Sequence, residues 1–133
     1  MTLFDLYDRA EGQGIEVDDV PMRALVSASF PEGWIAMDSS KIQSAAEEKT
    51  LLAHELSHIE TGSFYNIYSK YDLKSKCEYK ANAHAIQLLI PQSQLRKAFR
   101  RGITEIWELA EHFGVTEDFV RQTVEYYAAG KLN

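Results

Sequence analysis

The stretch that decides the fold is LLAHELSHIETG, residues 51–62, in which two histidines lie four positions apart and a glutamate follows the first. At about 100° per residue, His54 and His58 lie about 40° apart around a helix and one turn apart along it. Both imidazoles can therefore reach one ion, and zinc accepts neutral imidazole nitrogens as ligands. The alternative is a pair of surface or hydrogen-bonded core histidines, the commoner role for any single histidine.

The helix around this motif is predicted at residues 45–61. Ser44 is expected to begin it as the N-cap of a capping box with Glu47, and Gly62 to end it. The apolar stripe of this helix is centred roughly 120–150° away from the two histidines, and it consists of Leu52, Leu56 and Ile59. Because His-Glu-x-x-His arises by chance in roughly one chain of this length in a few hundred, its position in an amphipathic helix favours a metal site.

Glu55 is too constrained to chelate a metal together with both histidines, but it can hold a water molecule beside the ion. A glutamate there can take a proton from the water during attack and deliver it to the departing amine. The alternative for Glu55 is a solvated carboxylate without a catalytic role.

A third ligand is needed, because a catalytic zinc site has three protein ligands and an open fourth position. The best candidate is Glu78 in CEYKANAHAIQLLIP, residues 77–91, on a predicted helix at 75–90. The helix face around it is lined mainly by small residues, which allow close helix approach: Ala81, Asn82, Ala85 and Leu89. His84 points about 120° away and is the second choice, and Glu60 or Asp72 could bind only through an unusual fold of the loop.

The rest of the chain predicts an α+β fold. A short helix is expected at 3–11, and β-prone runs at 15–22, 24–30 and 33–38 predict a small antiparallel sheet of about three strands. Residues 63–75 lack a clear period and are predicted as a loop. Three shorter helices are expected near 93–101, 104–113 and 117–128.

With these residues assembled, the chain resembles the ImmA/IrrE family of bacterial zinc-dependent endopeptidases. TLLAHELSH is similar to the zinc helix of that family, and CEYKANAHAIQLLIP is similar to its glutamate-x-x-Ala-Asn segment ending in Leu-Leu-x-Pro. The resemblance covers roughly residues 1–130. Two departures are Ser57, where a glycine is common, and Lys80, where a second acidic residue is common.

The resemblance implies Zn²⁺ on His54, His58 and Glu78, with Glu55 as the general base. It implies a zincin-like (gluzincin-type) metallopeptidase core at 1–91. The residues after this core predict a helical, helix-turn-helix-like unit at 92–133 that packs on it. The resemblance also implies limited proteolysis of a protein substrate, a helix-turn-helix transcriptional repressor of a prophage, mobile element or stress-response locus.

The C-terminal helices bring in a different class of function, a DNA-binding regulator. Ala110, Gly114 and Val120 stand at helix-turn-helix offsets. However, residues 104–128 hold six acidic residues and one basic residue, a balance of −5, whereas a recognition helix needs cations for phosphates. Direct nucleic-acid binding is therefore not expected. The preceding basic group forms a solvated face or a contact for an acidic partner: Arg96, Lys97, Arg100 and Arg101.

For catalysis, an extended peptide is expected to lie along an exposed edge of the small sheet. A further donor to the tetrahedral oxyanion is expected on general grounds, and the candidates are Tyr65, Tyr68, Tyr71 and His84. A third interpretation is a non-catalytic regulatory protein that binds zinc and a repressor but does not cleave the repressor.

Composition further narrows the classes of protein to which the chain can belong. The 133 residues carry a net charge of −6 with a pI near 5.2, a balance that repels phosphate backbones. No apolar run approaches the roughly 20 residues that span a bilayer, so membrane insertion is not expected. The amino terminus lacks the pattern of a signal peptide, and the single cysteine, Cys77, agrees with a reducing compartment. Both observations predict a cytoplasmic protein.

Overall fold

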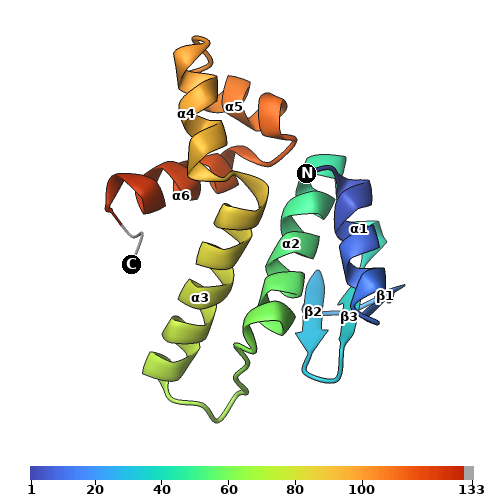
Figure 1. Ribbon diagram of the computed structural model, residues 1–133. Coiled ribbons are helices and arrows are strands. Elements are labelled where there is room, and N and C mark those ends of the chain that lie inside the picture. The colour runs from blue at the N-terminus through green and yellow to red at the C-terminus, as the bar shows by residue number, and fades with distance from the viewer. Residues whose placement is uncertain (131–133) are drawn as a thin grey trace.

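The computed structural model describes residues 1–130 and is an α+β fold with six α-helices and a three-stranded sheet (Figure 1). The elements follow in the order α1 (Leu3–Gly12), β1 (Glu16–Asp19), β2 (Ser27–Phe30), β3 (Trp34–Met37), a 3-10 turn (Ser39–Lys41), α2 (Ala45–Thr61), α3 (Tyr71–Leu89), α4 (Gln92–Arg100), α5 (Ile106–Phe113) and α6 (Glu117–Ala128). No helix in the described range has both the length and the apolar character needed to cross a bilayer.

The sheet has the order β1-β3-β2 and is mixed. β2 pairs antiparallel with β3, as predicted, but β1 pairs parallel with β3, so the prediction of a purely antiparallel sheet is wrong for β1. The reason is topological: the chain leaves β1 and crosses to the far edge before it forms the β2–β3 hairpin. β3 then returns between the two earlier strands and runs in the direction of β1.

α2 lies between the sheet and α3, and the two helices α2 and α3 pack side by side (Figure 1). It has the predicted bounds because its ends carry strong local signals. The Ser44 hydroxyl accepts a hydrogen bond from the Glu47 N–H at the start, and Gly62 adopts a left-handed conformation with φ of 66° at the end.

α3 begins at Tyr71, four residues earlier than predicted. The predicted loop at 63–75 therefore includes the first turn of a helix. Tyr71 and Asp72 are exposed in this turn, so it has no buried face and produces no apolar periodicity in the sequence. Burial-based patterns cannot detect such a turn.

One hydrophobic core joins the sheet side of the molecule to the C-terminal helices. Leu52 and Leu56 of α2 are fully buried in it, and Leu95, Leu109 and Val120 of α4–α6 belong to the same cluster. The buried Lys49 of α2 also donates a hydrogen bond to the carbonyl of Phe113, at the end of α5. The division into 1–91 and 92–133 stays a prediction, and its last three residues lie outside the described range.

A polar network around Glu60 joins the first three helices. The Glu60 carboxylate, 8% exposed, accepts hydrogen bonds from Arg9 Nε and Nη2 at 2.6 and 2.8 Å, from Gln13 Nε2 at 2.7 Å and from His84 Nε2 at 2.8 Å. Burial by itself would raise the pKa of Glu60, but the hydrogen bonds from Arg9, Gln13 and His84 lower it to about 2.

This network predicts a specific acid sensitivity. Because the folded pKa of Glu60 is below its ordinary value of 4.5, its contribution to stability is full above about pH 5 and is lost as pH falls towards 2. Glu60→Gln is expected to cost about 2 kcal/mol at pH 7 and less below pH 3. Urea unfolding at pH 7 and pH 3 measures the difference, with the exposed Glu125→Gln as the control. An equal loss in the free energy of unfolding at both pH values would contradict the lowered pKa of Glu60.

Candidate metal centre

Three side chains from α2 and α3 converge on one point. His54 and His58 come from successive turns of α2, and Glu78 comes from the facing side of α3. Glu78 Oε2 lies 3.0 Å from His58 Nε2 and 3.2 Å from His54 Nε2, and the two Nε2 atoms are 3.2 Å apart. The arrangement can hold a metal ion.

The spacing of these donor atoms fits a zinc ion. Donors at about 2.0–2.1 Å from an ion in tetrahedral geometry lie about 3.3 Å from one another, and the three distances here are 3.0 to 3.2 Å. The set of two imidazoles and one carboxylate is that of catalytic zinc sites with an open fourth position.

The other ring nitrogens of both histidines have fixed partners. His58 Nδ1 donates to the Ser63 carbonyl at 2.6 Å, and His54 Nδ1 donates to Asn82 Oδ1 at 3.0 Å. A proton on each Nδ1 leaves the lone pair of each Nε2 directed at the metal position. Asn82 comes one helical turn after Glu78, so α3 supplies both a candidate ligand and the group that orients another.

Glu55 is 7% exposed and projects from α2 towards β2. Its Oε2 accepts a hydrogen bond from Ser27 Oγ at 2.6 Å, and its Oε1 accepts one from Ser29 Oγ at 2.7 Å. The carboxylate is therefore held at both oxygens and stands beside the metal-binding group without belonging to it.

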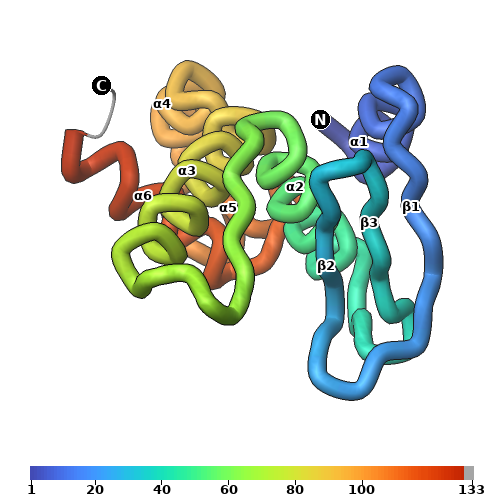
Figure 2. Tube along the Cα trace, turned by 90° about the horizontal axis from the view of Figure 1, so that it is seen from below, coloured from blue at the N-terminus to red at the C-terminus, as the bar shows by residue number. Residues whose placement is uncertain are grey.

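A cleft of about 340 Å³ gives access to these residues. Its lining includes residues of β2 and of the segment that joins α2 to α3, and the course of both parts of the chain can be followed in Figure 2. Its lining consists of Leu25, Ser27, Ala28 and Ser29 on one side, His54, Glu55, His58 and Glu78 at the centre, and Ser63, Phe64 and Tyr65 on the other. β2 is an edge strand, so it borders the cleft with one side unpaired by any strand in the described range.

The four candidates for an oxyanion donor have different positions. Tyr65 lines the cleft, and its hydroxyl donates to Glu78 Oε1 at 2.7 Å. That hydrogen bond to a carboxylate is the main reason why the pKa of Tyr65 rises to about 12, with desolvation second. Tyr68 and Tyr71 are 88% and 80% exposed and do not line the cleft. His84 points to Glu60 instead.

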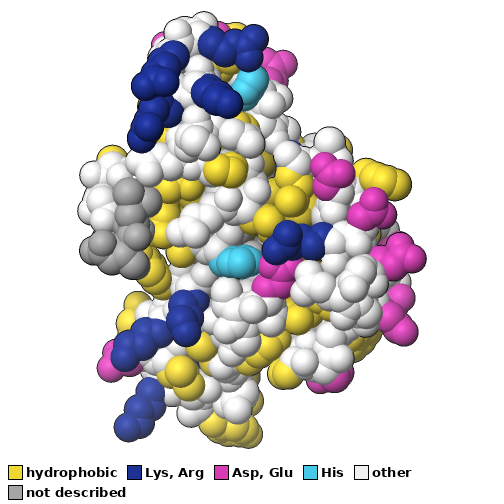
Figure 3. Space-filling model, in the orientation of Figure 1, with side chains coloured by type: hydrophobic (Ala, Val, Ile, Leu, Met, Phe, Trp, Pro, Cys, Tyr) yellow, Lys and Arg dark blue, Asp and Glu magenta, His cyan; other side chains and the backbone are white. Residues whose placement is uncertain are grey.

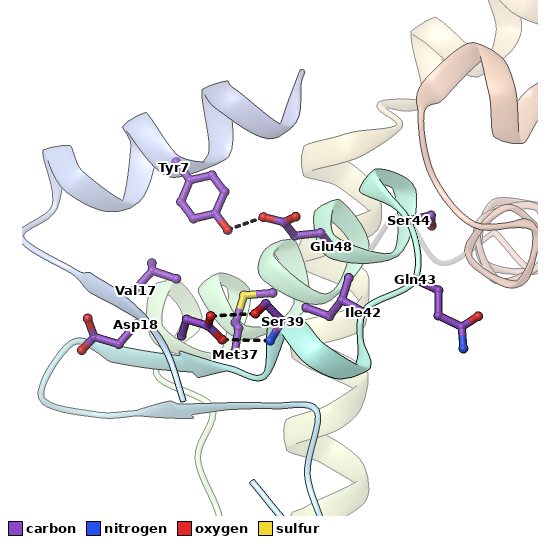
Figure 4. A pocket seen from close by; sticks show the side chains of 10 residues that line it. Tyr7, Val17, Asp18, Met37, Ser39, Ile42, Gln43, Ser44 and Glu48 are labelled. Atoms are coloured by element: carbon purple, nitrogen blue, oxygen red, sulfur yellow. Dashed lines mark hydrogen bonds between the residues drawn. The ribbon is translucent and has the colours of Figure 1, made fainter. Parts of the chain in front are cut away.

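A second hollow of about 360 Å³ lies between α1, the sheet and the start of α2 (Figure 4). Tyr7 donates to Glu48 across it, and the Ser39 hydroxyl and N–H donate to Asp19 at its border. None of its lining residues belongs to the metal-binding group. The pairs Tyr7–Glu48 and Ser39–Asp19 join elements of the fold across this hollow, which is a structural role.

Sequence reasoning missed the groups that orient the site. The spacing of four between Glu78 and Asn82 could have indicated Asn82. Ser27 and Ser29 alternate along a strand and could have been identified as sharing a face, but only the fold brings that face to Glu55. The Ser63 carbonyl has no side-chain signal.

Of the two departures from the family pattern, Lys80 is exposed, whereas Ser57 is fully buried and its Oγ has no hydrogen-bond partner among the described residues.

Comparison with known proteins gives one finding. The family model described as IrrE N-terminal-like domain, Peptidase_M78, matches residues 26–125, which include β2, the candidate metal ligands, Glu55 and most of the C-terminal helices. A search among curated proteins found no match.

Proposed function

This chain belongs to the Peptidase_M78 family of IrrE N-terminal-like domains, and we propose on that basis that it is a zinc-dependent endopeptidase acting by limited proteolysis. The observation that carries the proposal is the convergence of His54, His58 and Glu78, whose donor atoms lie 3.0 to 3.2 Å apart. A zincin-like core at 1–91 with a helix-turn-helix-like unit at 92–133 is part of this proposal.

Zinc is the proposed metal, held by His54, His58 and Glu78. When bound, it supplies a Lewis acid that polarises the scissile carbonyl and acidifies the attacking water. Asn82 and the Ser63 carbonyl keep the two imidazoles oriented for it.

Glu55 is the proposed general base. Its carboxylate takes a proton from the attacking water as the new C–O bond forms, and passes it to the amine nitrogen as the C–N bond breaks. Tyr65 is the proposed donor to the oxyanion, because it is the one residue among the four candidates that lines the cleft.

The substrate is proposed to be an extended segment of a protein that adds a strand to the free edge of β2. We extend the proposal to a helix-turn-helix transcriptional repressor of a prophage, mobile element or stress-response locus, as the family resemblance implies. We also propose action in the cytoplasm, with which the single cysteine, Cys77, agrees. Basic side chains gather over the α4 end of the molecule (Figure 3), where an acidic surface of such a repressor could dock.

The test is cleavage of a peptide library prepared from a bacterial proteome. New amino termini are identified by mass spectrometry after incubation with the zinc-loaded protein, with the protein after chelation, and with the chelated protein after zinc is returned. We expect a small set of cleavages that disappears on chelation and reappears with zinc. A zinc-loaded protein that produces no new termini would overturn the peptidase proposal and favour a regulatory protein that binds without cutting.

A further inference from the structure

Glu55 is held by the strand that faces the cleft rather than by its own helix. Ser27 and Ser29 donate to its two oxygens at 2.6 and 2.7 Å. They are the first and third residues of β2, and because strand side chains alternate, both hydroxyls lie on the face towards α2.

The register of the β2–β3 hairpin shows which way the backbone groups of these two serines point. The pairs are Ser27 with Met37, Ala28 with Ala36, Ser29 with Ile35 and Phe30 with Trp34. Just before β2, the Asp38 N–H donates to the Val26 carbonyl at 2.8 Å, so residues 26, 28 and 30 are the ones bonded to β3. In an antiparallel ladder the intervening residues point their N–H and C=O groups the other way. The backbone groups of Ser27 and Ser29 therefore face the free edge of β2.

The other side of β3 agrees with this assignment. The Glu16 N–H donates to the Gly33 carbonyl at 3.1 Å, and the Val20 N–H donates to the Met37 carbonyl at 2.8 Å. The backbone groups of residues 33 and 37, in and next to the central strand β3, therefore point towards β1. The backbone groups of the alternate residues point towards β2.

We infer that Ser27 and Ser29 form a serine clamp, a pair of positioning residues that ties the general base to the strand on which the peptide binds. This inference rests on the proposed function. A peptide that pairs with the free edge of β2 bonds to the backbone of the same two residues whose hydroxyls hold Glu55. The serine clamp thereby fixes the carboxylate relative to the peptide backbone, independently of the metal ligands.

The serine clamp predicts that loss of the two hydroxyls lowers the rate of turnover and leaves peptide binding nearly unchanged. Without the two hydroxyls, the Glu55 carboxylate has a wider choice of rotamers and spends less time in the productive one, while the backbone groups that bind the peptide remain. Ser27→Ala/Ser29→Ala is expected to lower kcat by about 30-fold with KM within about twofold. Threonine at both positions retains the hydroxyls and is expected to keep kcat within about threefold of the unmodified protein.

The experiment uses a quenched fluorescent peptide built on the strongest cleavage site from the proteome library. Zinc content by elemental mass spectrometry and peptide affinity in the Glu55→Gln background are measured for each variant, and neither is expected to change. The exposed Ser93→Ala on α4 is the control for loss of a serine hydroxyl. If the double variant does not fold, Ser27→Ala and Ser29→Ala singly serve the same test, each with an expected decrease in kcat of about fivefold.

The outcomes separate the inference from the function on which it rests. A kcat within threefold of the unmodified protein, a change in KM alone, or a loss of zinc would each overturn the serine clamp while leaving the peptidase in place. Failure of the unmodified zinc-loaded protein to cleave any library peptide overturns the proposed function, and the clamp with it, before a serine variant is measured.

Discussion

Replacing Glu55 by glutamine is expected to lower kcat/KM by about a thousandfold while zinc remains bound at about one ion per chain. Glutamine has nearly the shape of glutamate. Its Oε1 can still accept a hydrogen bond from one of the two serine hydroxyls, and its Nε2 can donate one to the other, but glutamine cannot take a proton from water. Because Glu55 is not a member of the metal-binding group, the metal should be unaffected. Cleavage of the library-derived peptide and elemental mass spectrometry measure the two quantities.

Glu111→Gln is the matched control for this substitution, because Glu111 is an exposed carboxylate on α5. Its activity is expected to equal that of the unmodified protein. If Glu55→Gln retained activity within tenfold, Glu55 would not be the general base. Loss of zinc from the same variant would instead mean that Glu55 contributes to the ligand set.

Removing Glu78 is expected to remove the metal. Glu78→Ala leaves two imidazoles and no carboxylate, and we expect zinc affinity to fall by more than about a hundredfold, since loss of a group outside the ligand set already costs 10–100-fold. Metal content after dialysis should fall from about one zinc per chain to nearly none. Peptide cleavage should be lost with it.

Two nearby residues supply controls that test the choice of third ligand. His84 stands on the same helix as Glu78 but donates to Glu60, and Asp72 is exposed in the first turn of α3. Both His84→Ala and Asp72→Ala are expected to retain zinc. Retention of zinc by Glu78→Ala together with its loss from His84→Ala would contradict the assignment and favour the second choice made from the sequence.

Local signals explain why some elements could be predicted accurately. Ser44 and Gly62 define α2 through backbone groups at the helix ends, which depend only on neighbouring residues. The start of α3 was missed because its first turn is exposed. The parallel pairing of β1 was missed because short strands with few buried side chains carry almost no information about their partners.

The sequence by itself determined that His54 and His58 share one face of a helix, because helical spacing is a local property. It also selected Glu78 as the best third ligand from the small residues around it. Only the tertiary structure decided that Ser27 and Ser29 hold Glu55, that Asn82 and the Ser63 carbonyl orient the imidazoles, and that Tyr65 reaches the cleft while Tyr68 and Tyr71 do not. These contacts join residues on different elements, and their partners are set by how α2, α3 and the sheet pack together rather than by spacing along the chain.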